Sequence, residues 1–447
     1  MSRFVGNYLT VLRVVVVIIP VSTGGAVWAQ DPCLVAKLAP GDADVELGLG
    51  AGFGSSAAMD VDTIVIGASQ DQERAEGSGA AYVFVRQGDD WIEQTKLIGS
   101  GAAFNDAFGS AVDVDGDRII VGMPHSDPAG SDFGEAYIFQ RSGVVWVEQA
   151  RLIPSVSTYD DFFGRSVAIS GDRAIVGAVG GRNEDLDIGA AFIFRWTGTD
   201  WVEEKRLVGP VPGARFGSDV AISGARVVVA ASRDDGLCPG DMGCNSGKVH
   251  VYGHDGTDWL LEAMITPNDI AAADAFGTAV VVEGGTLVAS SPHHTSANTF
   301  GAVYVFHFDG VNWIEEAELT NATSQAGDEF GHGLALDADR LLVAQLFGPA
   351  QLYRMVVAGW QQVNVVLEAG RVVDVSANEA LVATRVYSFS NVRQCIPTVS
   401  EWGIIVLAIL LTTGATLVLR RRGSVASHTH SENLSMMKRS KTQLRQL

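Results

Sequence analysis

The sequence predicts an all-β protein: a seven-bladed β-propeller, closed by its own N-terminal strand and followed by a C-terminal transmembrane helix. Three observations support this prediction. A Phe-Gly pair recurs six times at intervals of 53 to 60 residues, each time before two short apolar runs joined by a small turn. The second half of each unit repeats as well. The strand that the last unit lacks is present at the other end of the chain, so the units can form a ring.

Residues 1–29 have the pattern of an export signal. Arg3 and Arg13 precede or flank an apolar run that Pro20 interrupts, and Ala29 offers a small residue for cleavage. The run is too short and too broken to be a good membrane span. An exported chain can form disulfides, and this chain contains four cysteines.

Residues 30–394 hold the repeats. The Phe-Gly pairs begin at Phe53, Phe108, Phe163, Phe216, Phe276 and Phe330, and a degraded seventh copy has Ala369-Gly370 instead. Each unit continues with a strand that starts at Gly and carries aromatic residues two apart, as in GAAYVF, and then with a strand led by Trp. Four strands in each of seven units predict a propeller whose stacked blades bury one another's faces.

The ring should close through the N-terminus. The seventh unit has no Trp-led strand, and the segment CLVAKLAP, residues 33–40, aligns with the fourth strand of the other units. This closure places Cys33 near Cys395, and we predict a disulfide between them. A second, local disulfide is predicted between Cys238 and Cys244. Free thiols are the alternative at both places.

With these motifs in place, residues 33 to 390 resemble FG-GAP repeat proteins, which include the propeller of integrin α subunits and many exported bacterial proteins. The resemblance implies a seven-bladed propeller used for adhesion or ligand recognition. It does not by itself imply catalysis.

The run Asp113, Asp115 and Asp117 is similar to the start of a calcium loop. Calcium-binding blades of the family use a longer loop there, and calcium needs six to eight oxygen ligands. We therefore expect a tight hairpin turn around Gly116 and no cofactor. Calcium elsewhere is left open, for example among Asp234, Asp235 and Asp241.

Candidate ligand-binding residues lie in the loops after the second strand of each blade. These loops differ in length and chemistry while the strands repeat, as loops that carry function do; solvated loops without a ligand are the alternative. A metal cluster of His125 with His293 and His294 is a further alternative, but we predict no metal ligands because histidines in polar loops are usually just exposed. The predicted binding residues are Arg74, His125, Asp127, Arg182, Asp185, Arg233, Asp235, His293 and His294.

Residues 395–423 combine the segment IPTVSEWG, an apolar run and three arginines. The run is about long enough for a transmembrane helix, and the arginines should stay cytoplasmic, with a basic cytoplasmic tail at 424–447. This end resembles an IPTL-type sorting signal, which implies a sorting or processing protease; Val399 replaces the usual Leu. A plain membrane anchor is the alternative. The matching residues are Ile396, Pro397, Thr398, Trp402, Gly403, Arg420, Arg421 and Arg422.

The composition narrows the function. The formal net charge is −21 and the positive residues at the two ends make the central part more acidic still, so we expect no nucleic-acid partner. We find none of the common catalytic motifs and predict that the protein is not an enzyme. The expected function is that of an exported, surface-anchored propeller, released if the C-terminus is processed, that binds an extracellular protein or polysaccharide. A structural envelope or matrix component is the alternative, and a propeller enzyme is a third.

Overall fold

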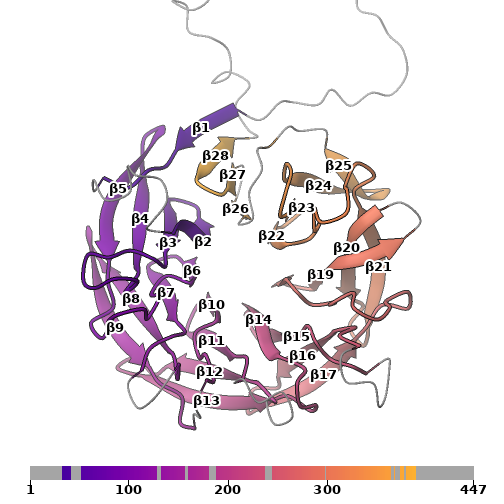
Figure 1. Cartoon of the computed structure of the whole chain (residues 1–447), viewed down its shortest axis with the longest axis horizontal. Helices are drawn as coiled ribbons and strands as arrows, with labels where there is room; N and C mark the ends of the chain where they lie inside the picture. Colours follow the sequence, from indigo (N-terminus) through magenta and orange to yellow (C-terminus); the bar gives the residue numbers. More distant parts are fainter. Residues whose placement is uncertain are drawn as a thin grey trace, which may run out of the picture.

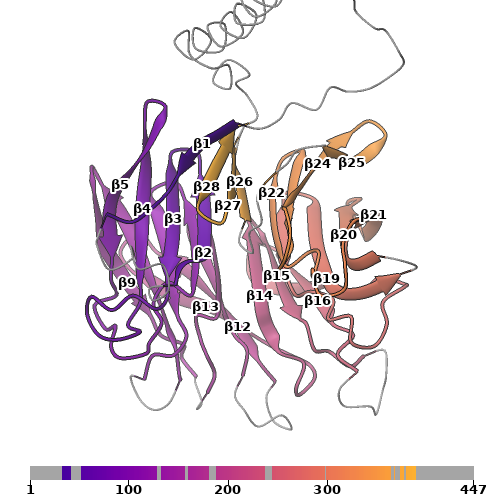
Figure 2. The ribbon, with the colours of Figure 1, turned by 45° about the horizontal axis from the view of Figure 1, so that its top comes forward.

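The computed structural model describes residues 33–41, 52–127, 132–156, 160–180, 188–236, 244–296, 299–363, 367, 373–376 and 379–388. In this part of the chain, seven antiparallel sheets of four strands stand around a common axis (Figure 1). Figure 2 shows the same ring tilted by 45°, with the strands of the blades running between its two faces. The predicted all-β, seven-bladed propeller is therefore confirmed.

The first four blades follow the chain in order. Their strands are β2 (Phe53–Asp60), β3 (Thr63–Ala68), β4 (Ala80–Gln87) and β5 (Asp90–Leu97) in blade one; β6 (Ala111–Asp115), β7 (Arg118–Met123), β8 (Glu135–Ser142) and β9 (Val145–Leu152) in blade two; β10 (Ser166–Ser170), β11 (Arg173–Ala178), β12 (Ala190–Trp196) and β13 (Trp201–Val208) in blade three; and β14 (Phe216–Ser223), β15 (Arg226–Ala231), β16 (Lys248–His254) and β17 (Trp259–Ile265) in blade four.

The last three blades complete the ring. Their strands are β18 (Val280–Glu283), β19 (Thr286–Ser296), β20 (Thr299–Phe308) and β21 (Trp313–Thr320) in blade five; β22 (Gly333–Asp337), β23 (Arg340–Ala344), β24 (Gln351–Val356) and β25 (Gly359–Val363) in blade six; and β26 (Val373–Ser376), β27 (Glu379–Val382), β28 (Arg385–Ser388) and the N-terminal β1 (Cys33–Lys37) in blade seven.

The N-terminal strand closes the ring as predicted. β1 pairs antiparallel with β28, and the seventh sheet has the order β1-β28-β27-β26. Leu38, just after β1, is buried in an apolar cluster with side chains of blades one and seven, and its N–H donates to the carbonyl of Thr384. The two ends of the propeller are thus joined within one sheet.

The Phe of each Phe-Gly pair packs on aromatic side chains of the third strand, as in blades two and three. Phe108 is fully buried, and its ring meets those of Tyr137 and Phe139 edge to face at 5.5 and 6.1 Å. Phe163 packs in the same way on Phe192 and Phe194. In these two blades, the aromatic residues two apart in the third strand therefore pack on the Phe of their own blade.

The glycine beside each Phe permits a close approach between neighbouring blades. Phe108 forms an isolated parallel bridge with Gly79 of the preceding blade. Gly109 has a φ of 86°, and a Cβ there would collide with the carbonyl oxygen of Ala80. Glycine is the residue that meets both conditions without strain.

Side chains at the end of each first strand join it to the next blade. Their oxygens accept a hydrogen bond from a main-chain N–H in the adjacent turn. The described pairs are Asp60 with Gly116, Asp115 with Gly171, Ser170 with Gly224, Ser223 with Gly284, Glu283 with Ala338, and Ser376 with Val61.

These bonds explain the Asp-x-Asp-x-Asp run. Asp115 accepts from Gly171, and Asp113 accepts from the N–H of Ile169, also in blade three, at 2.7 Å. Asp117 lies 3.4 Å from the Nε atom of Arg141. The run turns at Gly116 (φ 57°), which confirms the predicted hairpin. Its first two carboxylates connect blades two and three.

Three carboxyl groups on the innermost strands have raised pKa values. Asp113 and Asp374 lie two residues before the ends of their first strands, and Asp219 lies four residues before the end of its own. Each accepts a hydrogen bond from the first strand of the next blade. Burial raises the pKa of Asp113 and Asp219 to about 7 and that of Asp374 to about 8, and repulsion from Asp113 adds to the shift at Asp374.

These carboxyls should make the protein less stable as the pH rises. Their ordinary pKa is 3.8, so between about pH 4 and pH 7 the folded state holds protons that the unfolded chain has released. The stabilisation that these protonated carboxyls contribute is complete below about pH 4 and is lost as the pH rises through about 7 to 8. We expect Asp374→Asn to reduce the difference in urea midpoint between pH 5 and pH 8.5. Asp89→Asn, in an exposed turn, is the control, and an Asp374→Asn variant with the full pH dependence would contradict this assignment.

Other predictions fall outside the described residues. These include the export signal at 1–29 and the C-terminal segment with its transmembrane helix. No helix able to cross a membrane is found in the part of the chain that the structure describes. Cys244 is buried, at 3 % exposure, but Cys238 and Cys395 are not described, so both disulfide pairings stay predictions.

Candidate recognition face

The two faces of the ring differ in construction. One face, which we call the turn face, carries the short turns between first and second strands and those between third and fourth strands. The other, the loop face, carries the longer loops after the second strands and the connections from one blade to the next. The predicted binding residues belong to the loop face.

In blades one and two these residues make polar contacts within the loop face. The guanidinium of Arg74 donates to the carbonyl of Gly99 at 2.8 Å. His125 Nδ1 lies 2.8 Å from a carboxylate oxygen of Asp132, and the exposed Asp127 accepts a hydrogen bond from the N–H of Asp132 at 2.6 Å. The loop of blade two is therefore held by contacts within itself, and that of blade one by a contact to the connection that leads to blade two.

The residues predicted in blades three to five are less uniform. Arg233 is exposed, whereas Asp235 accepts a hydrogen bond from the N–H of Asn245 at 2.6 Å. His293 is exposed and lies 3.8 Å from the carboxylate of Glu329. Arg182, Asp185 and Asp241 lie outside the described residues.

One loop-face position recurs in blades one, four and five. It lies three residues after Ala68, Ala231 and Ser291, the second-strand residues that pair with the residue following the Gly of the third-strand motif. In blade one it is Asp71, which is buried and binds Lys96 Nζ at 2.8 Å and the hydroxyl of Tyr82 at 2.9 Å. In blade four it is Asp234, which pairs with Lys248 at 3.0 Å. Asp234 thus already has a cationic partner from its own blade.

In blade five that position is His294. Its side chain is 5 % exposed, and its ligand nitrogen lies within 4.8 Å of carboxylate oxygens of Asp269 and Glu318. Asp269 and Glu318 were missed by the sequence analysis. They come from different segments, and the only signal was that Glu318 stands where other units have Lys or Arg, as at Lys96 and Arg151.

A pocket of about 200 Å³ opens on the loop face of blade three. Apolar walls come from Val156, Ile188 and Phe192, and the charged side chains of Asp161 and Arg206 lie in the lining. The Arg206 guanidinium lies 5.7 Å from the Phe192 ring centre, in a cation–π contact. The pocket can hold one side chain or one sugar unit, with an acidic group directed at Arg206.

Three of the acids that precede Phe-Gly pairs cap turns with their carboxylates. Asp106 accepts from the N–H of Ala103, Asp274 from that of Ala271, and Asp328 from that of Gln325, each at 2.7 Å.

Comparison with protein families gives two matches. FG-GAP repeats match at residues 34–84, 91–139, 146–194, 201–252 and 259–306, more than half of the chain. Each match begins in the outermost strand of one blade and ends in the third strand of the next, so the repeat crosses a blade boundary. The IPTL-CTERM motif matches residues 394–422. No curated protein matches the chain.

Proposed function

Because the chain belongs to the FG-GAP repeat family, we propose that it is a recognition protein whose loop face binds an extracellular protein or polysaccharide. Its repeats and its C-terminal IPTL-CTERM motif indicate an exported protein of the cell surface. The proposal includes a membrane anchor in residues 395–423, held until a processing protease acts on the sorting motif.

The pocket in blade three is the observation that carries the recognition proposal. It joins an apolar wall to one cation and one carboxylate on the face that has the variable loops. Its volume is below the roughly 300–1,000 Å³ usual for sites that enclose a whole small molecule. A single residue or sugar of a larger partner fits it better, with neighbouring loops in contact with the rest.

The turn face does not suit the same role. Its turns are short, and their N–H groups are bonded to side chains of neighbouring blades, as with Gly116 and Gly284. FG-GAP propellers are typically non-catalytic, and we propose the same for this chain.

The proposal predicts that one charge reversal on the loop face weakens binding. The purified protein is applied to an array of polysaccharides and matrix proteins, with calcium and with a chelator. Arg206→Glu should reduce the affinity for the bound partner at least tenfold, because it replaces the pocket's cation with a carboxylate.

Arg195→Glu is the matched control, because Arg195 lies in the same blade near the turn face. Equal losses in both variants would contradict a pocket on the loop face. An intact protein that binds nothing on the array would instead favour a structural component of the envelope.

A further inference from the structure

His294 is a buried histidine with one nitrogen unsatisfied. Its Nδ1 lies 2.7 Å from a carboxylate oxygen of Asp274, which also accepts the N–H of Ala271. An ionised carboxylate only accepts hydrogen bonds, so Nδ1 carries the proton and Nε2 presents its lone pair. Nε2 is buried and has no hydrogen-bond partner. A carboxylate behind a histidine in this way is the usual support of a metal-binding imidazole.

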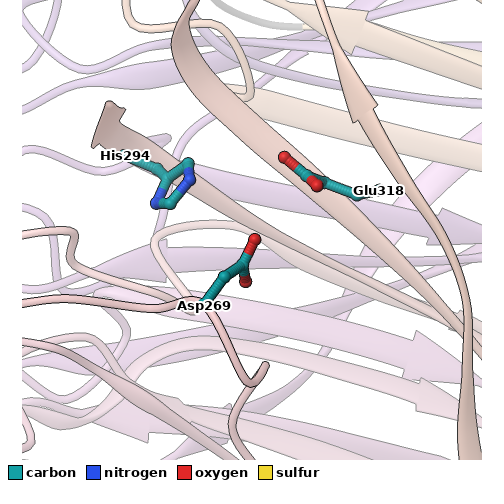
Figure 3. A group of neighbouring side chains, drawn as sticks. All are labelled: Asp269, His294 and Glu318. Carbon is teal, nitrogen blue, oxygen red and sulfur yellow. The ribbon is translucent and has the colours of Figure 1, made fainter. Parts of the chain in front are cut away.

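Two carboxylates face this histidine. Asp269 lies in the connection from β17 to β18, and Glu318 lies on β21. Their oxygens and the histidine nitrogen lie within 4.8 Å of one another, and Figure 3 shows the side chains around one shared space. The hydroxyl of Tyr304 donates to Asp269 at 3.1 Å and helps to orient its carboxylate.

Blade one has a cation at the place where blade five has Glu318. In blade one, Lys96 lies opposite Tyr82 and its ammonium group binds both Asp71 and Glu73 at 2.8 Å. In blade five, Glu318 lies opposite Tyr304 at the equivalent place. The position that supplies a cation in blade one therefore supplies a third negative or ligating group in blade five.

We propose that Asp269, His294 and Glu318 form a binding site for one Zn²⁺ ion. One imidazole and two carboxylates are ligands that Zn²⁺ uses, whereas Ca²⁺ takes six to eight oxygens. Zinc bonds of about 2.0–2.2 Å at tetrahedral angles put two ligands of one ion about 3.3–3.6 Å apart. The ligand atoms lie within 4.8 Å of one another, so the exposed carboxylates need to close by at most about 1.5 Å. Water supplies the remaining ligands of the zinc ion. This site is independent of the recognition proposal.

The test compares zinc binding among matched variants of glutamates on β21. The purified full-length protein is stripped of metal and titrated with ZnCl₂ against a chromophoric chelator. We expect the wild type to bind one more equivalent of tight Zn²⁺ than Glu318→Lys, which places an ammonium group where Lys96 stands in blade one. Glu318→Gln should bind that equivalent at least tenfold more weakly. Glu316→Gln removes a charge from the same exposed strand and should bind as the wild type does.

Thermal unfolding without metal checks the variants. Glu318→Lys should unfold at or above the wild-type temperature, because its cation replaces a carboxylate beside Asp269. Added Zn²⁺ should raise the unfolding temperature of the wild type but not that of Glu318→Lys. A wild type without the extra equivalent would overturn the proposal. So would a Glu318→Lys variant that is folded and binds zinc with unchanged stoichiometry and affinity.

Discussion

Replacing Phe108 by alanine is expected to destabilise the propeller by about 3–5 kcal/mol, the range for removal of a buried aromatic side chain. Phe108 is fully buried, and its ring packs edge to face on Tyr137 and Phe139. Its backbone also forms the bridge to Gly79, so the cavity would open at a contact between two blades. The loss should appear as a lower urea midpoint.

Phe104 provides the control for this experiment. It lies four residues earlier in the same connection and is 62 % exposed. Phe104→Ala should change the free energy of unfolding by no more than about 0.5 kcal/mol, as surface substitutions usually do. Similar urea midpoints for the two variants would show that the buried packing of Phe108 does not stabilise the blade.

Removal of the closing strand should have an effect at least as large. A chain that begins at Gly41 lacks β1 and Leu38, so β28 becomes an open edge and blade seven no longer joins blade one. Burial of a leucine contributes about 1.5–3 kcal/mol, and each of several lost hydrogen bonds contributes about 1 kcal/mol. We expect a loss of roughly 5 kcal/mol and a broader urea transition than in a chain that begins at Cys33.

A peptide of residues 33–40 keeps this test decisive if the shortened chain is poorly folded. The peptide should bind the open edge as an added strand and restore the transition. A shortened chain that unfolds at the same urea concentration as the control would show that closure by β1 does not stabilise the ring.

The architecture followed from the sequence because its determinants are local and repeated. The alternation of apolar residues, the Gly-containing turns and the Trp-led strands each lie within a single unit. The closure by residues 33–40 could be predicted because one unit lacked a strand that another segment supplied.

The inter-blade polar contacts could not be predicted in this way. Asp113 and Asp115 bond to N–H groups 56 residues further along the chain. Within their own hairpin they had the appearance of metal ligands or turn residues. Only the stacking of blades two and three shows that their partners are main-chain groups.

The cluster around His294 shows the same limit for a candidate site. From the sequence, His294 could be grouped only with His293 and His125, the other histidines in loops after second strands. In the structure His293 is exposed near Glu329. His125 lies in blade two, away from His294, and contacts Asp132 of its own loop. The groups that do meet His294 come from a blade connection and a fourth strand, so their approach depends on the packing of the whole loop face.

Hydrogen exchange of the purified protein, with and without its best-bound polymer from the array, tests the recognition account most directly. The account predicts slower exchange in loop-face segments such as 69–79, 188–190 and 292–296. It predicts no change in turn-face segments such as 61–62, 116–117 and 224–225. Protection confined to the turn face would contradict the account, because the partner would then contact the side of the ring without the pocket.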